Sequence, residues 1–356
     1  MAQQLTIKQI AQEAGVSVGT VDRVLHNRGK VSPKALEAVQ AVLNTQSYKY
    51  NLHTSAVAFK KTRKSLHVVI SIPSSEKGEY WDLMKNGLDR AFREYSDISI
   101  QYEYFFFDQF NSLSCREVYR SVAGMNCSAV ILATTFIEET RELCSRLDES
   151  GIPYVFVDGF VSGTHPVGAF MVDQISCGRL LARLMDGFTP ADSEIAVLLP
   201  KRIGTQISNN SALRLQAFKS FFAEHNSPRV LKEGFFSMEG NSSISSEIND
   251  FLSGNPNVGG IAVVISAGYY VADALAASGR SDLVVGGFDI TDGNARCVEA
   301  GSMDFLINQH PGKQGLYAVE SMLHYLLYGA PDKNRKERLP IDIVLRENLD
   351  SWRGSE

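Results

Sequence analysis

The sequence has neither the pattern of a signal peptide nor that of a membrane-spanning segment. Its start, MAQQLTIKQI, has no basic segment followed by an apolar stretch, and no run of eighteen apolar residues occurs anywhere. These absences argue against a secreted or membrane-spanning protein. We therefore expect a cytoplasmic protein with no membrane partner.

The five cysteines are few, odd in number and without a Cys-x-x-Cys pair: Cys115, Cys127, Cys144, Cys177 and Cys297. This spacing disfavours a disulfide framework, a redox centre and a metal site. We expect reduced, mostly buried thiols.

Sequence motifs of common enzymes are also missing, including the Walker loop, the His-Glu-x-x-His pair and the dinucleotide-binding fingerprint. One catalytic pattern does occur, because GVSVG at residues 15–19 fits the Gly-x-Ser-x-Gly nucleophile elbow. That motif needs a strand before the serine, whereas Ser17 follows a predicted helix. We expect no enzyme, no catalytic residue, no metal and no cofactor, and the alternative is a cleft enzyme.

The length, composition and charge of the chain predict more than one folded unit. A chain of 356 residues exceeds one typical core, and 44% hydrophobic with 21% charged residues is ordinary for globular protein. The net charge of −5 is unevenly distributed, since residues 1–64 carry +7 and the remainder −12. A basic end on an acidic body would be attracted to phosphate at that end only.

The basic end has the pattern of three short helices. Thr6 and Gln9 form a capping box before the first helix, Gly15 ends it, Ser17 caps the second, and Ser32 with Pro33 opens the third. Their spacing turns these apolar residues toward one small core: Ile7, Ile10, Ala11, Ala14, Val21, Val24, Leu25, Leu36, Val39, Val42 and Leu43. The opposite face of the second helix, with Val18, Gly19, Asp22, Arg23 and His26, is left for a partner.

From Leu66 onward the pattern changes to short apolar runs that alternate with helical segments. The runs are LHVVISI, SIQYEYFFF, AVILATT, PYVFVD, EIAVLL, GIAVVIS and DLVVGGF. Strands that are apolar on both faces are typical of parallel sheets covered by helices. We predict an α/β body of two doubly wound parallel-sheet lobes after a small all-α headpiece, with 61–64 and 332–338 as exposed connections.

The N-terminal segment resembles the headpiece of the lactose-repressor (LacI/GalR) family of bacterial regulators. The matching elements are AGVS at residues 14–17, T-V-x-R-V at 20–24 and Val-Ser at 31–32, and the likeness continues to IVLREN at 343–348. The resemblance implies that the second helix lies in the major groove of operator DNA. The alternative is a three-helix module that only packs or docks.

Within this family pattern, Val18, Gly19 and Arg23 would face base edges, and only Arg23 can bind a guanine by a bidentate hydrogen bond. Ser17, Thr20, Lys30 and Ser32 are the expected phosphate contacts.

Asp22 departs from the family, which has a serine at this position. A carboxylate here would be repelled by phosphate unless it accepts from a cytosine amino group or pairs with Arg23 or Arg28.

Family members also carry a hinge helix that folds on DNA and inserts an apolar residue into the minor groove. Alignment on Asn51 places Val57 where the family has leucine, so the wedge is weaker or shared with Phe59. A flexible linker is the alternative. The resulting division is 1–50 for the headpiece and 51–64 for the hinge.

The body, residues 65–356, resembles periplasmic sugar-binding receptors, in which two lobes joined by three chain crossings hold ligand in the cleft between them. The resemblance implies a first lobe at about 65–173 and 310–338 and a second at about 174–309 and 339–353. Tyr80 and Trp81 then lie where receptors stack aromatic rings on a sugar, and the alternative is that both are core anchors of their helix.

The same resemblance supplies the polar ligand contacts. Arg214, in SNNSALRLQAF, would hold ligand oxygens with its guanidinium fork. Asp289 would accept from adjacent hydroxyls, with a helix cap as the alternative, and Gln309 would contact the sugar. Asp173 and Gln174 mark the first crossing and are secondary candidates, and Ser266 stands where relatives have Asn.

Together these patterns predict a ligand-responsive repressor that binds double-stranded operator DNA as a homodimer and senses a sugar or sugar derivative. An amino acid, a nucleoside or a phosphorylated metabolite remains open as effector. A sugar-binding receptor without DNA binding is the alternative function.

Overall fold

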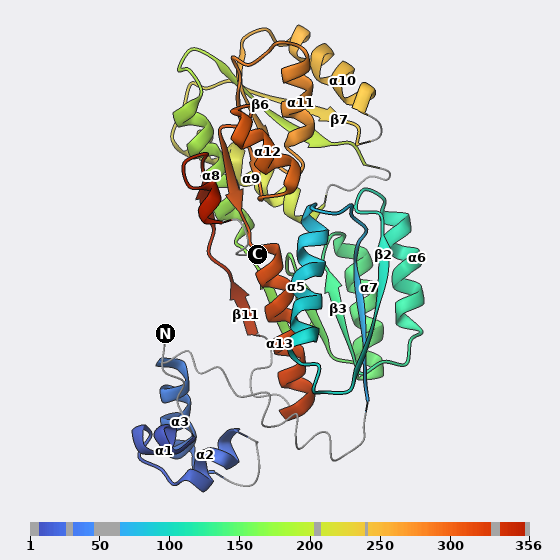
Figure 1. Cartoon of the computed structure of the whole chain (residues 1–356), viewed down its shortest axis with the longest axis vertical. Coiled ribbons are helices and arrows are strands. Elements are labelled where there is room, and N and C mark those ends of the chain that lie inside the picture. The colour runs from blue at the N-terminus through green and yellow to red at the C-terminus, as the bar shows by residue number, and fades with distance from the viewer. Residues whose placement is uncertain are drawn as a thin grey trace.

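The computed structural model of the chain describes residues 7–25, 31–45, 65–202, 208–238, 241–328 and 335–352. A small helical headpiece precedes two α/β lobes in this part of the chain (Figure 1). This arrangement confirms the predicted fold class.

The headpiece is held together by one small core. Ile10, Val21 and Val39 are fully buried there, one from each of α1 (Ile7–Glu13), α2 (Val18–Leu25) and α3 (Pro33–Thr45). The Ser17 hydroxyl accepts the backbone N–H of Thr20 at 3.0 Å and so caps α2, as predicted.

One headpiece prediction is wrong, because Leu36 is exposed rather than turned inward. Val39 and Val42 of α3 contact the core instead. Two short partner helices cover only a narrow stripe of α3, and Leu36 lies outside that stripe. Thr6 and the side chains of Leu25 and Leu43 lie outside the described part of the chain.

The first lobe contains a six-stranded sheet in the order β11-β5-β4-β3-β1-β2. The pairs β1–β2, β1–β3, β3–β4, β4–β5 and β5–β11 are all parallel. Its strands are β1 (Leu66–Pro73), β2 (Ile100–Phe107), β3 (Ala129–Ala133), β4 (Tyr154–Val157), β5 (Gly168–Met171) and β11 (Arg335–Arg338). Two helix pairs cover its two faces: α5 (Tyr80–Glu94) with α13 (Pro311–Tyr328), and α6 (Ser112–Ala123) with α7 (Ile137–Ser150).

The second lobe repeats this design with strand order β12-β10-β9-β8-β6-β7. Its strands are β6 (Glu194–Pro200), β7 (Leu231–Phe236), β8 (Val258–Val263), β9 (Val284–Phe288), β10 (Phe305–Asn308) and β12 (Asp342–Val344). Its helices are α8 (Gln174–Phe188), α9 (Asn209–Glu224), α10 (Asn241–Gly254), α11 (Tyr269–Ala277) and α12 (Asp292–Ala300), followed by a 3₁₀ turn at Leu349–Ser351. The edge strand β12 is antiparallel to β10, whereas the other described pairs are parallel.

The chain passes between the two sheets three times: between β5 and α8, between β10 and α13, and between β11 and β12. The predicted connection at 332–338 is partly wrong, because Arg335–Arg338 forms β11 and pairs with β5. Its charged composition suits an edge strand, which has one neighbour only.

Helices α5 and α13 approach closely because glycines form their contact. A Cβ on Gly87 of α5 would collide with the backbone carbonyl oxygen of Gly312 in α13. Gly315 of α13 likewise faces the carbonyl oxygen of Met84 at a distance that leaves no room for a side chain. Backbone, unlike a flexible side chain, cannot move aside without shifting the whole helix.

Gly87→Ala should therefore lower the free energy of unfolding by about 1–3 kcal/mol, because α5 and α13 must separate to admit a methyl group. Urea unfolding followed by circular dichroism would measure the change. Gly187→Ala in α8 is the matched control, since no atom lies within 4 Å of the added carbon. It should gain about 0.5–1 kcal/mol from helix propensity. Equal stability of Gly87→Ala and wild type would contradict the close packing.

Candidate functional site

A cavity of about 430 Å³ lies between the lobes, and residues from both of them line it. Its walls come mainly from segments that follow strand carboxyl ends, including those after β1, β2, β6 and β8. Open α/β sheets bind ligands at this end of their strands, and the volume is in the range of small-molecule sites.

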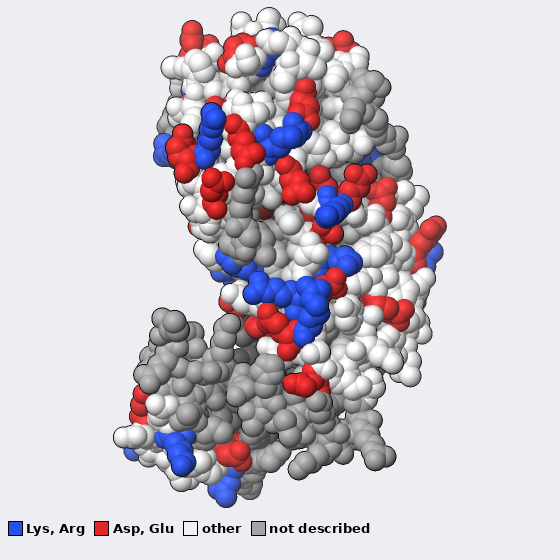
Figure 2. Space-filling view, viewed as in Figure 1, with Lys and Arg blue, Asp and Glu red and all other residues white. Residues whose placement is uncertain are grey.

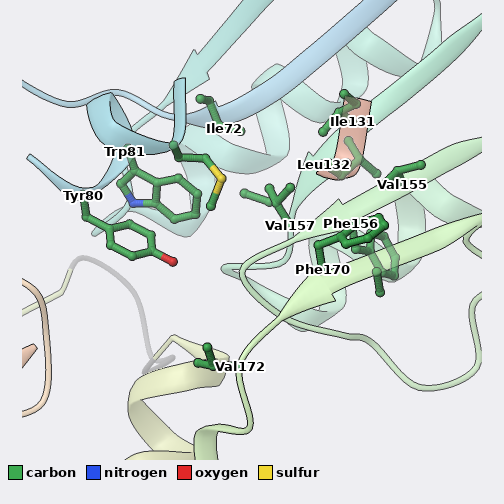
Figure 3. Close-up of a cluster of buried hydrophobic side chains, with 14 of the residues drawn as sticks. Ile72, Tyr80, Trp81, Ile131, Leu132, Val155, Phe156, Val157, Phe170 and Val172 are labelled. Atoms are coloured by element: carbon green, nitrogen blue, oxygen red, sulfur yellow. The ribbon is translucent and has the colours of Figure 1, made fainter. Parts of the chain in front are cut away.

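Two aromatic residues at the start of α5 form part of the first-lobe wall, as predicted for Tyr80 and Trp81. They are also core residues, and Figure 3 shows them bordering the side chains of Ile72 and Val157. The Tyr80 hydroxyl donates to the Asp158 carboxylate at 2.7 Å, and Trp81 Nε1 donates to Gln109 Oε1 at 3.0 Å. Tyr80 and Trp81 therefore belong both to the wall of the cleft and to the core.

Asp158 is a cavity residue that the sequence interpretation did not assign. It directly follows β4 with a φ of 72°, in the left-handed region that aspartate tolerates better than most residues. Burial raises the pKa of its carboxyl group, while the bond from Tyr80 and the charge of Arg214 oppose that rise. Asp289 follows β9, the equivalent strand of the second lobe, with a φ of 62°. Two matching acids therefore face the interlobe region.

Arg214 of α9 supplies the positive charge between these acids. Its side chain is buried, and Nε donates to Gln174 Oε1 at 2.7 Å, Nη1 to the Val264 carbonyl at 2.8 Å, and Nη2 to Gln309 Oε1. The guanidinium also lies 4.2 Å from the ring centroid of Phe288. Arg214, Ser266 and Gln309 all line the cavity, as the sequence predicted.

Asp289 lies behind that lining rather than in it. One carboxylate oxygen accepts the Gln309 N–H at 2.9 Å, and the other accepts the Ser266 hydroxyl and the Gln309 side-chain amide. A ligand would reach Asp289 only after Ser266 or Gln309 moved. The alternative role as a helix cap is also not seen, since Thr291 caps α12.

Burial raises the pKa of Asp289 to about 6, whereas the Ser266, Arg214 and Gln309 neighbours limit the rise. Without those donors, a fully buried carboxylate would be far less favourable than its protonated form.

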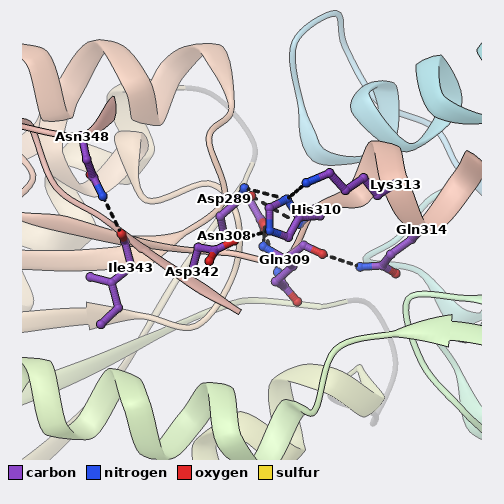
Figure 4. Close-up of polar contacts among 9 residues, drawn as sticks. All are labelled: Asp289, Asn308, Gln309, His310, Lys313, Gln314, Asp342, Ile343 and Asn348. Carbon is purple, nitrogen blue, oxygen red and sulfur yellow. Dashed lines mark hydrogen bonds and ion pairs between the residues drawn. The ribbon is translucent and has the colours of Figure 1, made fainter. Parts of the chain in front are cut away.

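Glutamines join the two acids across the second crossing, and Figure 4 shows the part of this chain that runs from Asp289 through Gln309 to Gln314. Gln314 accepts the Asp158 N–H at 3.0 Å and donates to the Gln309 carbonyl at 2.9 Å, and Gln309 in turn binds Asp289. The adjacent His310 pairs with Asp342 at the third crossing. The floor of the cavity and the crossings therefore form one polar network.

Asp173 does not join this network, and the structure places it away from the cavity lining. Its carboxylate accepts the N–H groups of Ile175 and Ser176 and so caps α8, and it also accepts from Arg338 at 2.9 Å. An aspartate directly before a helix is well suited to this cap. Its neighbour Gln174 does join the network, since it accepts from Arg214, but it does not line the cavity either.

Other cavity residues also went unrecognised in the sequence: Glu79, Gln109, Arg202, Asn210, Tyr269 and Tyr270. For Asp158 a usable signal exists, because both PYVFVD and the strand before Asp289 end on an aspartate. The others follow strands at positions where only the pairing of the lobes brings them together.

The predicted DNA-facing side of α2 is open. Ser17, Val18, Gly19 and Arg23 are exposed, with Thr20 half-buried beside them. Ser32 is exposed and accepts the N–H of Ala35 at 3.3 Å, whereas Lys30 and Val57 lie outside the described residues.

Much of the positive charge of residues 1–64 also falls outside the described part, which includes only Lys8, Arg23 and Lys34. Figure 2 shows acidic and basic side chains interspersed over one face of the lobes.

No described helix is both long and apolar enough to cross a membrane. Within the described ranges, no three His, Cys, Asp or Glu side chains gather as a metal site would require. Four of the five cysteines are buried and Cys127 is half-buried, which agrees with the predicted burial.

Comparison with known proteins identifies both parts of the chain. Residues 6–51 match the family described as bacterial regulatory proteins, lacI family, and residues 68–330 match the periplasmic binding protein domain. The chain belongs to the lacI family of bacterial regulators. Its body is a periplasmic binding protein domain, so the predicted family membership is confirmed.

Three similar proteins illustrate this lacI-family regulator's relationships. It is 26% identical to the ribose operon repressor of Lactococcus lactis over 349 residues, which are 97% of this chain and 98% of that protein. It is 35% identical to the regulator DegA of Bacillus subtilis over 86 residues, 24% of this chain and 25% of DegA. A solved putative LacI transcriptional regulator from Bacteroides fragilis matches with a TM-score of 0.76 and 25% identity, over 81% of this chain and 99% of that one.

Asp289→Asn should make the stability of this lacI-family regulator less dependent on pH. The folded-state pKa of about 6 lies above the ordinary 3.8, so the folded protein holds the proton more tightly than the unfolded chain does. Through this group, the wild-type free energy of unfolding falls as pH rises from about 4 to about 6, by about 3 kcal/mol. The asparagine variant lacks that fall, which urea unfolding at a series of pH values would measure.

Asp282→Asn is the control for this experiment. Its exposed carboxyl has a pKa below the ordinary value because Arg280 donates to it, so its contribution to stability has the opposite sign. This variant should retain the wild-type fall in stability between about pH 4 and pH 6. A profile for Asp289→Asn that parallels the wild type would refute the shifted pKa.

Proposed function

We propose that this lacI-family regulator is a repressor whose effector, a sugar or sugar derivative, binds in the interlobe cavity. The observation that carries the proposal is the polar network around Arg214, which presents its guanidinium, the Gln309 amide and the Asp158 carboxylate at one cavity wall. Hydroxyl groups both donate and accept, so a mixed set of charged and amide groups suits a polyol.

Aromatic side chains support the sugar assignment. Tyr80 and Trp81 line the cavity from the first lobe, while Tyr269 and Tyr270 line it from the second with their rings stacked at 4.2 Å. Aromatic faces pack on the apolar face of a sugar ring while hydroxyl groups bind the polar walls. The similarity to a ribose operon repressor along the whole chain agrees with this class of effector.

Asp289 takes a positioning role in this proposal. Its carboxylate holds the Ser266 hydroxyl and the Gln309 side chain, both of which line the cavity. It would therefore act on ligand affinity through these two groups, while Arg214, Asp158, Tyr80 and Trp81 would touch the ligand directly.

Ligand binding would be coupled to DNA through closure of the lobes. Asn210 of the second lobe donates to the Asp158 carbonyl of the first at 2.9 Å, and Asp292 N–H donates to the Gly78 carbonyl at 3.1 Å. A ligand that binds this closed arrangement more tightly than an open one shifts the population of lobe states by that difference in affinity.

We further propose that the regulator acts in the cytoplasm as a homodimer, placing two headpieces on a pseudo-palindromic operator. The exposed face of α2 would enter the major groove, with Arg23 reading a guanine and Ser17, Thr20 and Ser32 contacting phosphates. Lys30 and Val57 complete the proposed contacts. Closure of the lobes would change headpiece spacing and so operator affinity.

A thermal-shift screen of the full-length protein against sugars and other metabolites would test the effector class. A ligand that binds only the folded protein at about a hundred times its Kd adds about 2.7 kcal/mol of stability. The expected result is stabilisation by sugars, with loss of the shift in Arg214→Met while DNA binding persists. Stabilisation by amino acids or nucleosides alone would refute a sugar effector, and a chemically altered hit would favour an enzyme.

Arg23→Glu should abolish binding to promoter fragments selected with the wild-type protein, because it replaces a base-reading cation by an anion in the groove. Fluorescence anisotropy would measure DNA binding, and calorimetry would verify that ligand affinity is unchanged. Arg280→Glu, a charge reversal at a half-buried residue of the body, is the control. Unchanged DNA binding by Arg23→Glu would refute the assigned reading face and favour a receptor function.

A further inference from the structure

Arg202 reaches across the cavity from the second lobe to the first. It lies two residues beyond β6, and its Nη1 donates to the backbone carbonyl of Gln109, which follows β2. The guanidinium carbon lies 5.1 Å from the ring centroid of Phe110 and 5.7 Å from that of Phe136. Two first-lobe rings therefore hold the cation in place at the cavity wall.

Arg202 has no directly paired counter-ion among the described residues. Among the described residues, no carboxylate oxygen lies within 4.0 Å of its nitrogens, and its buried Nε has no hydrogen-bond partner. Burial lowers its pKa to about 10, and Asp108 is the acid whose charge opposes this shift. A desolvated cation without a counter-ion is unfavourable, so a ligand anion would find an unused and prepared donor.

The other two cations of the described cavity wall already have their partners. Lys201 donates to Glu247 at 2.6 Å, and each nitrogen of Arg214 donates to an amide or carbonyl oxygen. Arg202 is thus the cation of this described wall that has neither a paired carboxylate nor a hydrogen bond at every nitrogen.

Two further buried polar atoms of cavity residues lack partners in the described structure: Thr135 Oγ1 and Asn210 Oδ1. An unsatisfied buried polar atom is unfavourable unless a ligand completes it. Thr135 is adjacent to Phe136, one of the rings that hold Arg202. The cavity therefore offers a hydroxyl and an amide oxygen for ligand hydroxyl groups in addition to the free guanidinium N–H.

One acid of the cavity wall, Glu79, is held away from Arg202. Glu79 accepts a hydrogen bond from Tyr269 and lies where the segments after β1 and β8 meet. Arg202 meets Gln109 where the segments after β6 and β2 come together, one strand nearer the sheet edges. Asp108, on the same side, accepts the N–H of Phe110 at 2.8 Å. An anion beside Arg202 would therefore lie near one of these two carboxylates, that of Asp108. The guanidinium of Arg202 and the hydroxyl of Thr135 would both be available to donate to it.

We propose that Arg202 binds an oxyanion of the effector, so that the effector is an acidic sugar derivative carrying a carboxylate or a phosphate. This inference rests on the proposed sugar-sensing function and adds the ligand's charge to it. The polyol part would occupy the Arg214 and Gln309 wall, and the anion would lie under the guanidinium of Arg202. Because Arg202 joins the lobes, an anion bound there also favours closure.

Calorimetry with the full-length protein and matched probes tests this inference. The probes are neutral hexoses, the corresponding hexonates and the corresponding hexose 6-phosphates. One of the two acidic forms should bind about tenfold to a hundredfold more tightly than its neutral parent, the range of a charge-assisted hydrogen bond. A preference for the hexonate identifies a carboxylate, and a preference for the 6-phosphate identifies a phosphate.

Arg202→Met should reduce the ratio of acidic to neutral affinity to within about threefold, and Arg202→Lys should retain part of it because the charge remains. Arg296→Met, which removes an exposed cation that does not line the cavity, should keep the wild-type ratio.

Neutral sugars that bind wild type as tightly as acids would refute this inference alone, as would an unchanged ratio in Arg202→Met. Failure of every probe to bind wild type would refute the sugar effector itself and this inference with it.

Discussion

The burial of one guanidinium between two carboxylates is the constraint on which the body depends. Arg214 is the cation, and Asp158 and Asp289 follow equivalent strands of the two lobes. Removing such charges from water is tolerable only when hydrogen bonds replace hydration, and the glutamines at the crossings provide them. The same groups form the floor of the cavity, so the stability of the lobe junction and ligand recognition depend on one set of contacts.

Much of the fold was predictable because its central strands are apolar on both faces. Runs such as LHVVISI and AVILATT have no polar face and therefore predict buried parallel strands, as found for β1 and β3. The headpiece was predictable from caps and glycine, whose preferences are local. Arg214, Gln309 and Ser266 were found through the family pattern, and the structure brings all three to the cavity.

The remainder depended on contacts that a linear pattern does not contain. Strands β5 and β10 have only four residues each, so their length does not distinguish them from loops. Strand β11 is entirely charged or polar, so its hydrophobicity does not identify it as a strand. The role of Arg202 depends on its contacts with Gln109 and Phe110 of the opposite lobe, which the sequence does not reveal. Asp173 was misassigned for a related reason, since a helix cap and a ligand contact need the same residue type in the same place.

The order in which the chain builds its two sheets has a consequence for synthesis. The first lobe lacks α13 and β11 until all of β6 to β10 has been made, and α13 supplies buried core residues such as Ala318, Val319 and Leu323. A ribosome adding about 5–20 residues each second therefore leaves the α5 face of the first lobe uncovered for several seconds. During that interval the emerging first lobe is the species that chaperones would protect.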